Sequence, residues 1–200
     1  MDVSAISPPD ALPGGDDKAT WRRRLAGHRA AASGTRRQES EAARTRMVLA
    51  LPEVAGARTV AAYVSMPTEP DTSDLLHTLT ERGVQVLLPV LLPDLDLDWG
   101  VAGALAAGPG TLREPVGPHL GVDAIGTADV VLCPGLAADQ AGTRLGRGGG
   151  SYDRALARTR ADALRVVLLY EGELVDRLPA DPHDQPVHLA ITPVRAVRLG

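Results

Sequence analysis

Short apolar runs alternate with longer, mostly polar segments along this 200-residue chain. Five of the runs have the length and composition of buried β-strands: residues 59–65, 84–88, 128–133, 165–170 and 187–192. Four other segments have the composition and flanking residues of α-helices: residues 18–32, 36–51, 74–82 and 151–160. Strands that alternate with helices predict an α/β fold, with helices on both faces of a mostly parallel sheet.

Residues with strong capping or breaking preferences mark the ends of several predicted helices. Pro52 is expected to stop the second helix, because proline cannot continue it. We expect Thr72 or Ser73 to cap the helix over 74–82, and Gly83 to end it before the next strand. This strand–helix–strand succession predicts a right-handed βαβ crossover.

The two ends of the chain differ from its middle. Residues 1–15 contain three prolines, two glycines and two aspartates, which predicts a disordered tail. Asp17 is expected to help cap the first helix. Residues 90–120 predict only a short edge strand near residues 95–99. Because the sequence shows no internal repeat and no linker between domains, we expect residues 16–200 to form one α/β domain with a helical N-terminus.

The composition narrows the choice of function. A net charge of −4 argues against binding to nucleic acid or to an anionic membrane. The single cysteine, Cys133, excludes an intrachain disulfide and a cysteine-rich zinc site. The sequence shows neither a signal-peptide pattern nor an apolar run of membrane-spanning length. We therefore expect a cytoplasmic protein.

The strongest chemical signal lies between Gly142 and Asp153, where five glycines accompany Arg144 and Arg147. Glycines let a backbone approach a ligand closely, successive N–H groups form a concave anion site, and guanidinium groups add bidentate donors. The spacing matches neither a Walker A motif nor the GxGxxG fingerprint. A flexible surface loop is the alternative, but the arginines and the position between a strand and a helix favour anion binding.

This segment resembles the hallmark G-x-R-L-G-x-G-x-G-Y-Y-D of the 5-formyltetrahydrofolate cyclo-ligases, also called methenyltetrahydrofolate synthetases. Weaker similarities follow the same order over residues 16–193: Lys18 with Arg22, Tyr63–Ser65 with Glu69, Arg113–Pro115, and His183 with Asp184. Two positions depart from the family pattern, which usually has a lysine where Gly149 stands and an aromatic residue where Ser151 stands.

The resemblance implies a three-layer α/β/α architecture similar to the sugar-phosphate isomerase and CoA-transferase group. It also implies an ATP- and Mg²⁺-dependent enzyme, expected to be a monomer. Its small-molecule substrate is 5-formyltetrahydrofolate, with or without a polyglutamate tail, which it cyclises to 5,10-methenyltetrahydrofolate. In that reaction the formyl oxygen is phosphorylated, N10 attacks the activated carbon, and ADP and phosphate are released. A phosphoryl transfer of this kind asks the protein mainly to position the ligands and neutralise phosphate charge.

Site residues are implied where positions match. Those matching the family's ATP site are Lys18, Arg22, Arg144, Leu145, Gly146, Arg147, Gly148, Gly149, Gly150, Ser151 and Tyr152. Those matching its folate site are Val64, Glu69, Arg147, Gly148, Gly149, Gly150 and Ser151. Asp153 and Asp184 match its Mg²⁺-associated acids, and the expected catalytic residues are Arg144, Arg147 and Tyr152. Lys18 is also the one lysine among 21 basic residues, and with Arg22 it shares a helix face.

Two other hypotheses stay open at this point. A non-catalytic folate or nucleotide binder of the same fold would keep the glycine-rich loop, and the departures at Gly149 and Ser151 favour it. Intact Lys18, Arg22 and Asp153 oppose it. A nucleic-acid-binding module would use the basic segment 18–46, which has nine Lys or Arg against two acids but only one aromatic residue for base stacking.

Overall fold

The computed structural model describes residues 17–31 and 34–200, so the predicted tail at residues 1–15 lies outside the described residues. Its helices are α1 (Lys18–Ala31), α2 (Gly34–Leu49), α3 (Pro52–Ala55), α4 (Ser73–Glu81), α5 (Ser151–Ala157) and the 3₁₀ helix η1 (Val122–Thr127). Its strands are β1 (Thr59–Ala61), β2 (Gln85–Leu91), β3 (Leu97–Val101), β4 (Leu105–Ala107), β5 (Arg113–Pro115), β6 (Val130–Pro134), β7 (Ala137–Asp139), β8 (Arg144–Leu145), β9 (Leu164–Leu168), β10 (Leu174–Val175), β11 (Leu189–Ile191) and β12 (Ala196–Arg198).

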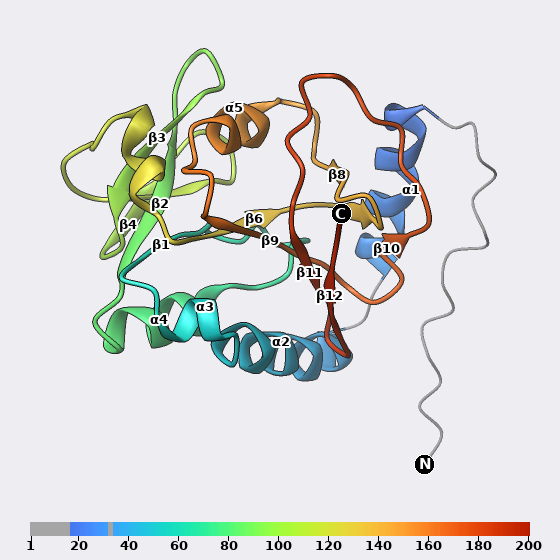
Figure 1. The fold of residues 1–200 in the computed structure, drawn as a ribbon, viewed down its shortest axis with the longest axis horizontal. Coiled ribbons are helices and arrows are strands. Elements are labelled where there is room, and N and C mark those ends of the chain that lie inside the picture. The colour runs from blue at the N-terminus through green and yellow to red at the C-terminus, as the bar shows by residue number, and fades with distance from the viewer. Residues whose placement is uncertain (1–16, 32–33) are drawn as a thin grey trace.

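A seven-stranded sheet in the order β12-β11-β9-β6-β1-β2-β3 forms the middle layer (Figure 1). Its five inner strands run parallel, and β3 and β12 pair antiparallel at the two edges. Strand β6 is apolar throughout, and β9 is apolar except for Arg165, because helices cover both faces of a parallel sheet. The expected three-layer α/β/α fold with a mostly parallel sheet is confirmed.

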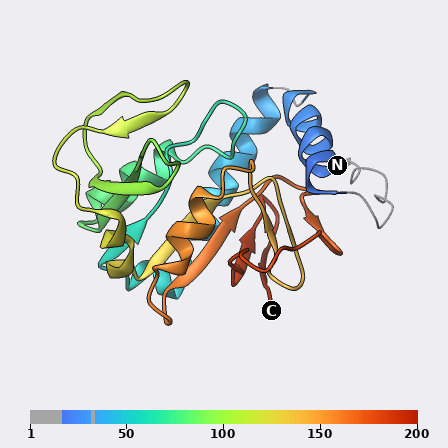
Figure 2. The ribbon, with the colours of Figure 1, turned by 90° about the horizontal axis from the view of Figure 1, so that it is seen from above.

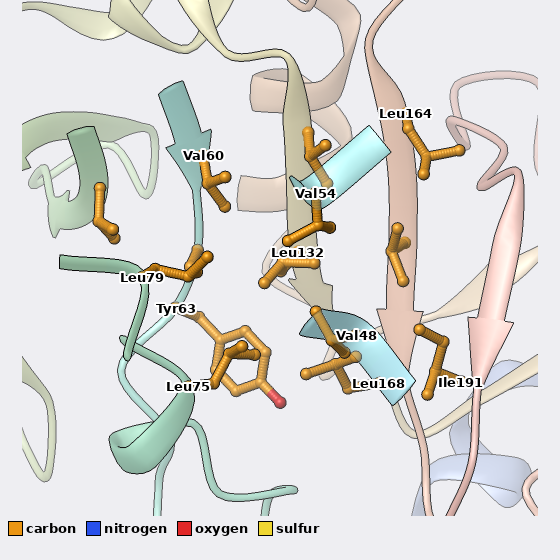
Figure 3. Close-up of a cluster of buried hydrophobic side chains, with 14 of the residues drawn as sticks. Val48, Val54, Val60, Tyr63, Leu75, Leu79, Leu132, Leu164, Leu168 and Ile191 are labelled. Carbon is orange, nitrogen blue, oxygen red and sulfur yellow. The ribbon is translucent and has the colours of Figure 1, made fainter. Parts of the chain in front are cut away.

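Helices α2, α3 and α4 cover one face of this sheet, and α5 covers the opposite face (Figures 1 and 2). On the first face, Val48, Val54 and Leu79 from these helices pack against strand residues such as Val60 and Leu132 (Figure 3). On the second face, α5 and η1 pack against β3 and β6. Burying each such aliphatic side chain stabilises the fold by about 1.5–3 kcal/mol.

Helix α1 belongs to a smaller, lateral part of the fold. Its Trp21 and Leu25 pack against Leu145 of β8 and Leu136, which precedes β7, in the three-stranded sheet β10-β7-β8. The helix therefore lies beside the main sheet rather than on either of its faces (Figure 2). Asp17 caps it, since its Oδ1 accepts a hydrogen bond from the N–H of Thr20 at 2.7 Å.

Most predicted elements are present, with two corrections at helix ends. Pro52 does more than follow the second helix: it opens the short α3, where its fixed φ suits the first helical position. The Thr72 side chain does not cap α4, because its hydroxyl donates to the carbonyl of Tyr63. Asp71 accepts the N–H of Ser73 at 3.1 Å instead.

Several short elements were not predicted. Strands β4, β5, β7, β8, β10 and β12 have only two or three residues each, too few for a periodic pattern. The predicted edge strand near 95–99 is β3, displaced by two residues. No helix in residues 17–31 and 34–200 combines the length and apolar character needed to cross a membrane.

Candidate functional site

The cavity of interest opens at the carboxyl ends of β1 and β6. From β1 the sheet continues to β2 on one side and to β6 on the other, so the strand order reverses at this point. Ligands of doubly wound sheets bind in the crevice outside such a reversal. The cavity has a volume of about 750 Å³, within the range of small-molecule binding sites, and extends to α1 and to the β4–β5 hairpin.

Every site residue predicted from the sequence lines this one cavity. They come from α1, the loop after β1, the glycine-rich loop with α5, and the loop before β11: Lys18, Arg22, Val64, Glu69, Arg144, Leu145, Gly146, Arg147, Gly148, Gly149, Gly150, Ser151, Tyr152, Asp153 and Asp184. The structure thus brings together segments up to 166 residues apart in the chain. Their individual roles remain predictions.

The glycine-rich loop is shaped by the elements on either side. Arg144 and Leu145 form the short strand β8, which pairs antiparallel with β7 and fixes the start of the loop. Gly148 and Gly150 have φ values of 110° and 70°, which side-chain-bearing residues rarely adopt. A Cβ atom at Gly148 would lie 3.3 Å from the Arg22 guanidinium carbon. Gly148 and Gly150 therefore allow the loop to turn sharply, and Gly148 also allows it to approach Arg22 closely.

Arg144 is held rigidly and is almost fully buried. Its Nη2 donates to Asp153 Oδ1 at 2.9 Å, and its Nη1 donates to the carbonyl of Pro134 at 3.1 Å. Its guanidinium carbon lies 5.9 Å from the centre of the Tyr152 ring. The Arg144 Nε atom is buried and has no hydrogen-bond partner among the described residues. A buried donor of this kind is costly unless a ligand accepts from it.

Lys18 connects α1 to the loop before β11. Its Nζ lies 2.6 Å from Asp184 Oδ2 and 2.7 Å from Asp181 Oδ2. Burial lowers the pKa of Lys18, but the two carboxylates outweigh it and raise the pKa overall. Burial raises the pKa of Asp184, but the N–H of Asp181 and the ammonium group outweigh it and lower the pKa overall. Lys18 and Asp184 are therefore both charged at neutral pH.

The acids near Lys18 also form the cation-binding candidate of the cavity. Asp181, His183 and Asp184 each place a potential ligand atom within 4.8 Å of the others. Carboxylate oxygens suit Mg²⁺, which usually takes one or two of them together with phosphate oxygens and water. Asp153, the other predicted metal residue, accepts hydrogen bonds from Arg144 and from the N–H of Gln185, both at Oδ1.

Arg22 and Arg147 flank the loop on the side of α1. Arg22 Nε donates to the carbonyl of Gly146 at 2.9 Å, which anchors the loop to the helix. Arg147 Nε donates to Glu69 Oε1 at 3.1 Å, and its Nη2 donates to Thr68 Oγ1 at 3.0 Å. The predicted nucleotide loop and the predicted folate-side acid are thus in direct contact.

Tyr152 lines the cavity and also packs against the core. Its ring packs against three apolar clusters of the core, and its hydroxyl is buried without a hydrogen-bond partner among the described residues. Burial raises the pKa of this hydroxyl well above its ordinary value. The phenol therefore stays protonated at neutral pH, and its unsatisfied O–H is available as a donor to a ligand.

Sequence reasoning missed part of the cavity wall. Arg29 is nearly fully buried, pairs with Glu173 through two contacts of 2.7 Å, and donates to the carbonyl of Gly135 at 2.6 Å. Leu91, Leu95 and other apolar residues of the β2–β3 hairpin also line the cavity. The pair joins residues 144 positions apart, and the apolar residues look like ordinary core positions, so a single sequence carries no signal for either.

Comparison with known proteins agrees with this site. The family model of the 5-formyltetrahydrofolate cyclo-ligases matches residues 15–193. The 5-formyltetrahydrofolate cyclo-ligase of Mycolicibacterium smegmatis is 44% identical over 167 residues, covering 80% of this chain and 86% of the relative. The Escherichia coli K12 cyclo-ligase is 34% identical over 157 residues, covering 76% of this chain and 86% of the relative.

A solved structure shares the fold over nearly the whole chain. The NMR structure of Aquifex aeolicus 5,10-methenyltetrahydrofolate synthetase superposes with a TM-score of 0.80 at 27% identity, covering 91% of this chain and 92% of that one. The family match covers every segment that forms the cavity. This chain belongs to the 5-formyltetrahydrofolate cyclo-ligase family.

Proposed function

We propose that this protein catalyses the ATP-dependent cyclisation of 5-formyltetrahydrofolate to 5,10-methenyltetrahydrofolate. The observation that carries the proposal is the convergence of every motif residue on one cavity at the strand-order reversal. The formyl oxygen attacks the γ-phosphorus of ATP, an O–P bond forms, and ADP leaves with the electrons of the broken bond. N10 then attacks the formyl carbon and loses its proton, and the C–O bond breaks to release phosphate.

The basic residues of the cavity take the phosphate end of ATP. Arg22 contacts the glycine-rich loop from α1, Lys18 of the same helix lines the same cavity, and Arg144 lies at the start of the loop. Four positively charged groups here, including Arg147, neutralise the charge that phosphoryl transfer concentrates on the γ-phosphate. The backbone N–H groups of residues 146–151 complete the cradle. Preorganised donors of this kind contribute several kcal/mol to such reactions.

The folate lies on the other side of the loop, against Val64 and Glu69. The Glu69 carboxylate is almost fully buried and already accepts from Arg147 and from the N–H of Met66. A carboxylate in this position accepts further hydrogen bonds from pterin N–H groups. Because Arg147 contacts Glu69, one side chain reaches both substrates, and Tyr152 donates its unsatisfied hydroxyl between them. This arrangement supports catalysis over mere binding.

We further propose Mg²⁺ as the companion of ATP, with Asp153 and Asp184 as the protein groups that hold it. The second carboxylate oxygen of Asp153 accepts no hydrogen bond from the described residues, and Asp184 lies in the cluster with Asp181. When bound, the ion neutralises phosphate charge and orients the γ-phosphoryl group. We propose that residues 16–200 act as one domain and that the protein is a cytoplasmic monomer.

A turnover assay tests the function directly. The purified protein is mixed with 5-formyltetrahydrofolate and MgATP, and the near-ultraviolet absorbance of methenyltetrahydrofolate is followed against a control without ATP. Growth of the band only with ATP supports the enzyme. Binding of folate or ATP without product identifies the non-catalytic binder instead, and salt-dependent RNA binding would favour the nucleic-acid module.

A further inference from the structure

Leu95 has an unusual backbone for its residue type. It is the one non-glycine residue with a positive φ, 66°, in the part of the chain that the structure describes. The left-handed region is unfavourable for leucine, and glycine or asparagine occupies it at lower cost. The Leu95 side chain is 47% exposed, so core packing does not compensate for the strain.

The tight turn at Leu95 is held in place from two sides. Arg154 of α5 donates one Nη2 to two carbonyls, Leu95 at 2.6 Å and Gly149 of the glycine-rich loop at 3.2 Å. The next residue, Asp96, receives two hydrogen bonds from Arg158, at 2.5 and 2.9 Å. Both arginines belong to or adjoin α5, which lies beside the β2–β3 hairpin (Figure 1).

Leu95 also lines the functional cavity. It continues a wall of apolar side chains that includes Leu91, Leu97 and Leu112. Strained residues that the surrounding structure holds in place are concentrated at ligand-binding sites. Here the strain places a large apolar side chain at the cavity, where a smaller or polar residue would suit the turn better.

We propose that Leu95 is a substrate-contact residue that determines specificity for the aromatic ring between the pterin and the glutamate of the folate, and that Arg154 positions it. The inference rests on the proposed function, because it takes its ligand from that reaction. The pterin and the glutamate carry most of the polar groups of the substrate, so the central ring is the part that an apolar wall accepts. Arg154 ties this wall to the loop assigned to ATP.

The experiment distinguishes the loss of a substrate contact from a loss of stability, because the chosen substitution relieves the backbone strain at residue 95. Leu95→Asn keeps a branched side chain of similar length and suits the left-handed backbone, but it removes the apolar contact. The Michaelis constant for 5-formyltetrahydrofolate should rise about tenfold, as expected when a hydrophobic contact is lost. The Michaelis constant for ATP should stay within twofold, and the melting temperature should stay the same or rise.

Leu95→Met is the matched control, because it keeps both the strain and an apolar side chain. Its Michaelis constant for 5-formyltetrahydrofolate should remain within about threefold of the wild-type value. Arg154→Gln, which weakens the attachment of Leu95, should raise the folate constant in the same direction as Leu95→Asn. An unchanged folate constant in Leu95→Asn, or a fall in melting temperature with equal losses for both substrates, overturns the proposal.

Direct titration of folate keeps this outcome distinct from failure of the proposed function. If the wild type shows no turnover, the cyclo-ligase assignment fails, and calorimetric binding of 5-formyltetrahydrofolate to the same variants still decides the role of Leu95. Binding that is about tenfold weaker in Leu95→Asn supports the contact. Equal binding, or a wild type that binds no folate, overturns it.

Discussion

The hydroxyl of Tyr170 donates a hydrogen bond of 2.8 Å to the backbone carbonyl of Glu69, across 101 residues of sequence. The Tyr170 ring also lies 5.2 Å from the guanidinium carbon of Arg29 and 5.0 Å from that of Arg44. Helices α1 and α2 each contribute one of these arginines. The loop that carries Glu69 is thereby attached to both N-terminal helices through one aromatic side chain.

The Tyr170–Glu69 bond predicts a selective effect of Tyr170→Phe. The ring and its cation–π contacts remain, but the Glu69 carbonyl loses its donor, at a cost of about 0.5–1.5 kcal/mol. We expect the Michaelis constant for 5-formyltetrahydrofolate to rise about two- to tenfold, with the constant for ATP unchanged. Steady-state kinetics with each substrate varied in turn measure both. Equal effects on both constants would mean that Tyr170 only stabilises the fold.

Asp153 is the residue for which the sequence and the geometry suggest different partners. The family resemblance assigns it to Mg²⁺, whereas the structure pairs its Oδ1 with Arg144 at 2.9 Å. If it holds the ion as proposed, Asp153→Asn should raise the Mg²⁺ concentration for half-maximal rate by on the order of tenfold. A titration of MgCl₂ at saturating ATP measures this shift.

Asp162→Asn is a suitable control for that titration. It makes the same charge change at an exposed acid paired with Arg160, which is not among the residues of the cavity wall. We expect a normal Mg²⁺ requirement in this variant. A higher Michaelis constant for ATP with a normal Mg²⁺ requirement in Asp153→Asn would reassign Asp153 as the residue that orients Arg144.

The main elements and the glycine-rich loop could be predicted because their signals are local, whereas the other cavity residues were identified through the family resemblance. The apolar runs of β6 and β9, the capping Asp17 and the glycine-rich motif each lie within a few consecutive residues. The same locality explains the misses. Whether Thr72 caps α4 depends on a competing acceptor, the Tyr63 carbonyl, that only the folded loop presents.

Long-range relationships in the site could not be read from one chain. Nothing in the sequence distinguishes Arg29, which is buried against Glu173, from the solvated arginines around it in α1. Likewise, Leu95 reads as part of a strand until its positive φ places it in a turn. Sequence patterns therefore identified the residues of the phosphate loop. The apolar wall of the cavity, which includes Leu91 and Leu95, could be identified only from the structure.

His188 makes the stability of the fold depend on pH near neutrality. Burial and the nearby Arg165 and Arg198 lower the pKa of this imidazole, and its Nδ1 accepts the N–H of Arg165 at 3.2 Å. The unfolded chain, with an ordinary histidine pKa of about 6.5, binds the proton more readily than the fold. The contribution of neutral His188 to the free energy of unfolding is therefore fully present above about pH 7, and it is lost as the pH falls through the lowered pKa.

Chemical denaturation at several pH values from 7.5 to 5 checks this expectation. His188→Asn, which keeps an acceptor oxygen but does not titrate, should show a flatter pH dependence of the free energy of unfolding. His77→Asn on α4 is the control, because that side chain is 72% exposed. If the free energy of unfolding of His188→Asn changed with pH as steeply as that of the wild type, the pH dependence would belong to other groups.

Gly149 offers a gain-of-function prediction, because the family pattern usually has a lysine there. Its φ is not positive, and a Cβ atom would meet only Ser151 Oγ, at an ordinary 3.4 Å, so the backbone accepts a side chain. Gly149→Lys adds an ammonium group to the wall of the phosphate cavity. We expect the Michaelis constant for ATP to fall about three- to tenfold, in line with about 1 kcal/mol for an added charge-assisted bond.

Gly149→Ala separates this gain from the loss of backbone freedom, and it should leave the Michaelis constant for ATP near its wild-type value.

Gly148→Ala should raise the Michaelis constant for ATP, the opposite of the effect expected for Gly149→Lys. Its φ of 110° is strained for alanine, and the new methyl group would press on Arg22 at 3.3 Å. Kinetics and melting temperatures of the three variants test the contrast. A Gly149→Lys enzyme with unchanged or weaker ATP affinity would show that Arg147 and Arg144 already neutralise the phosphates fully.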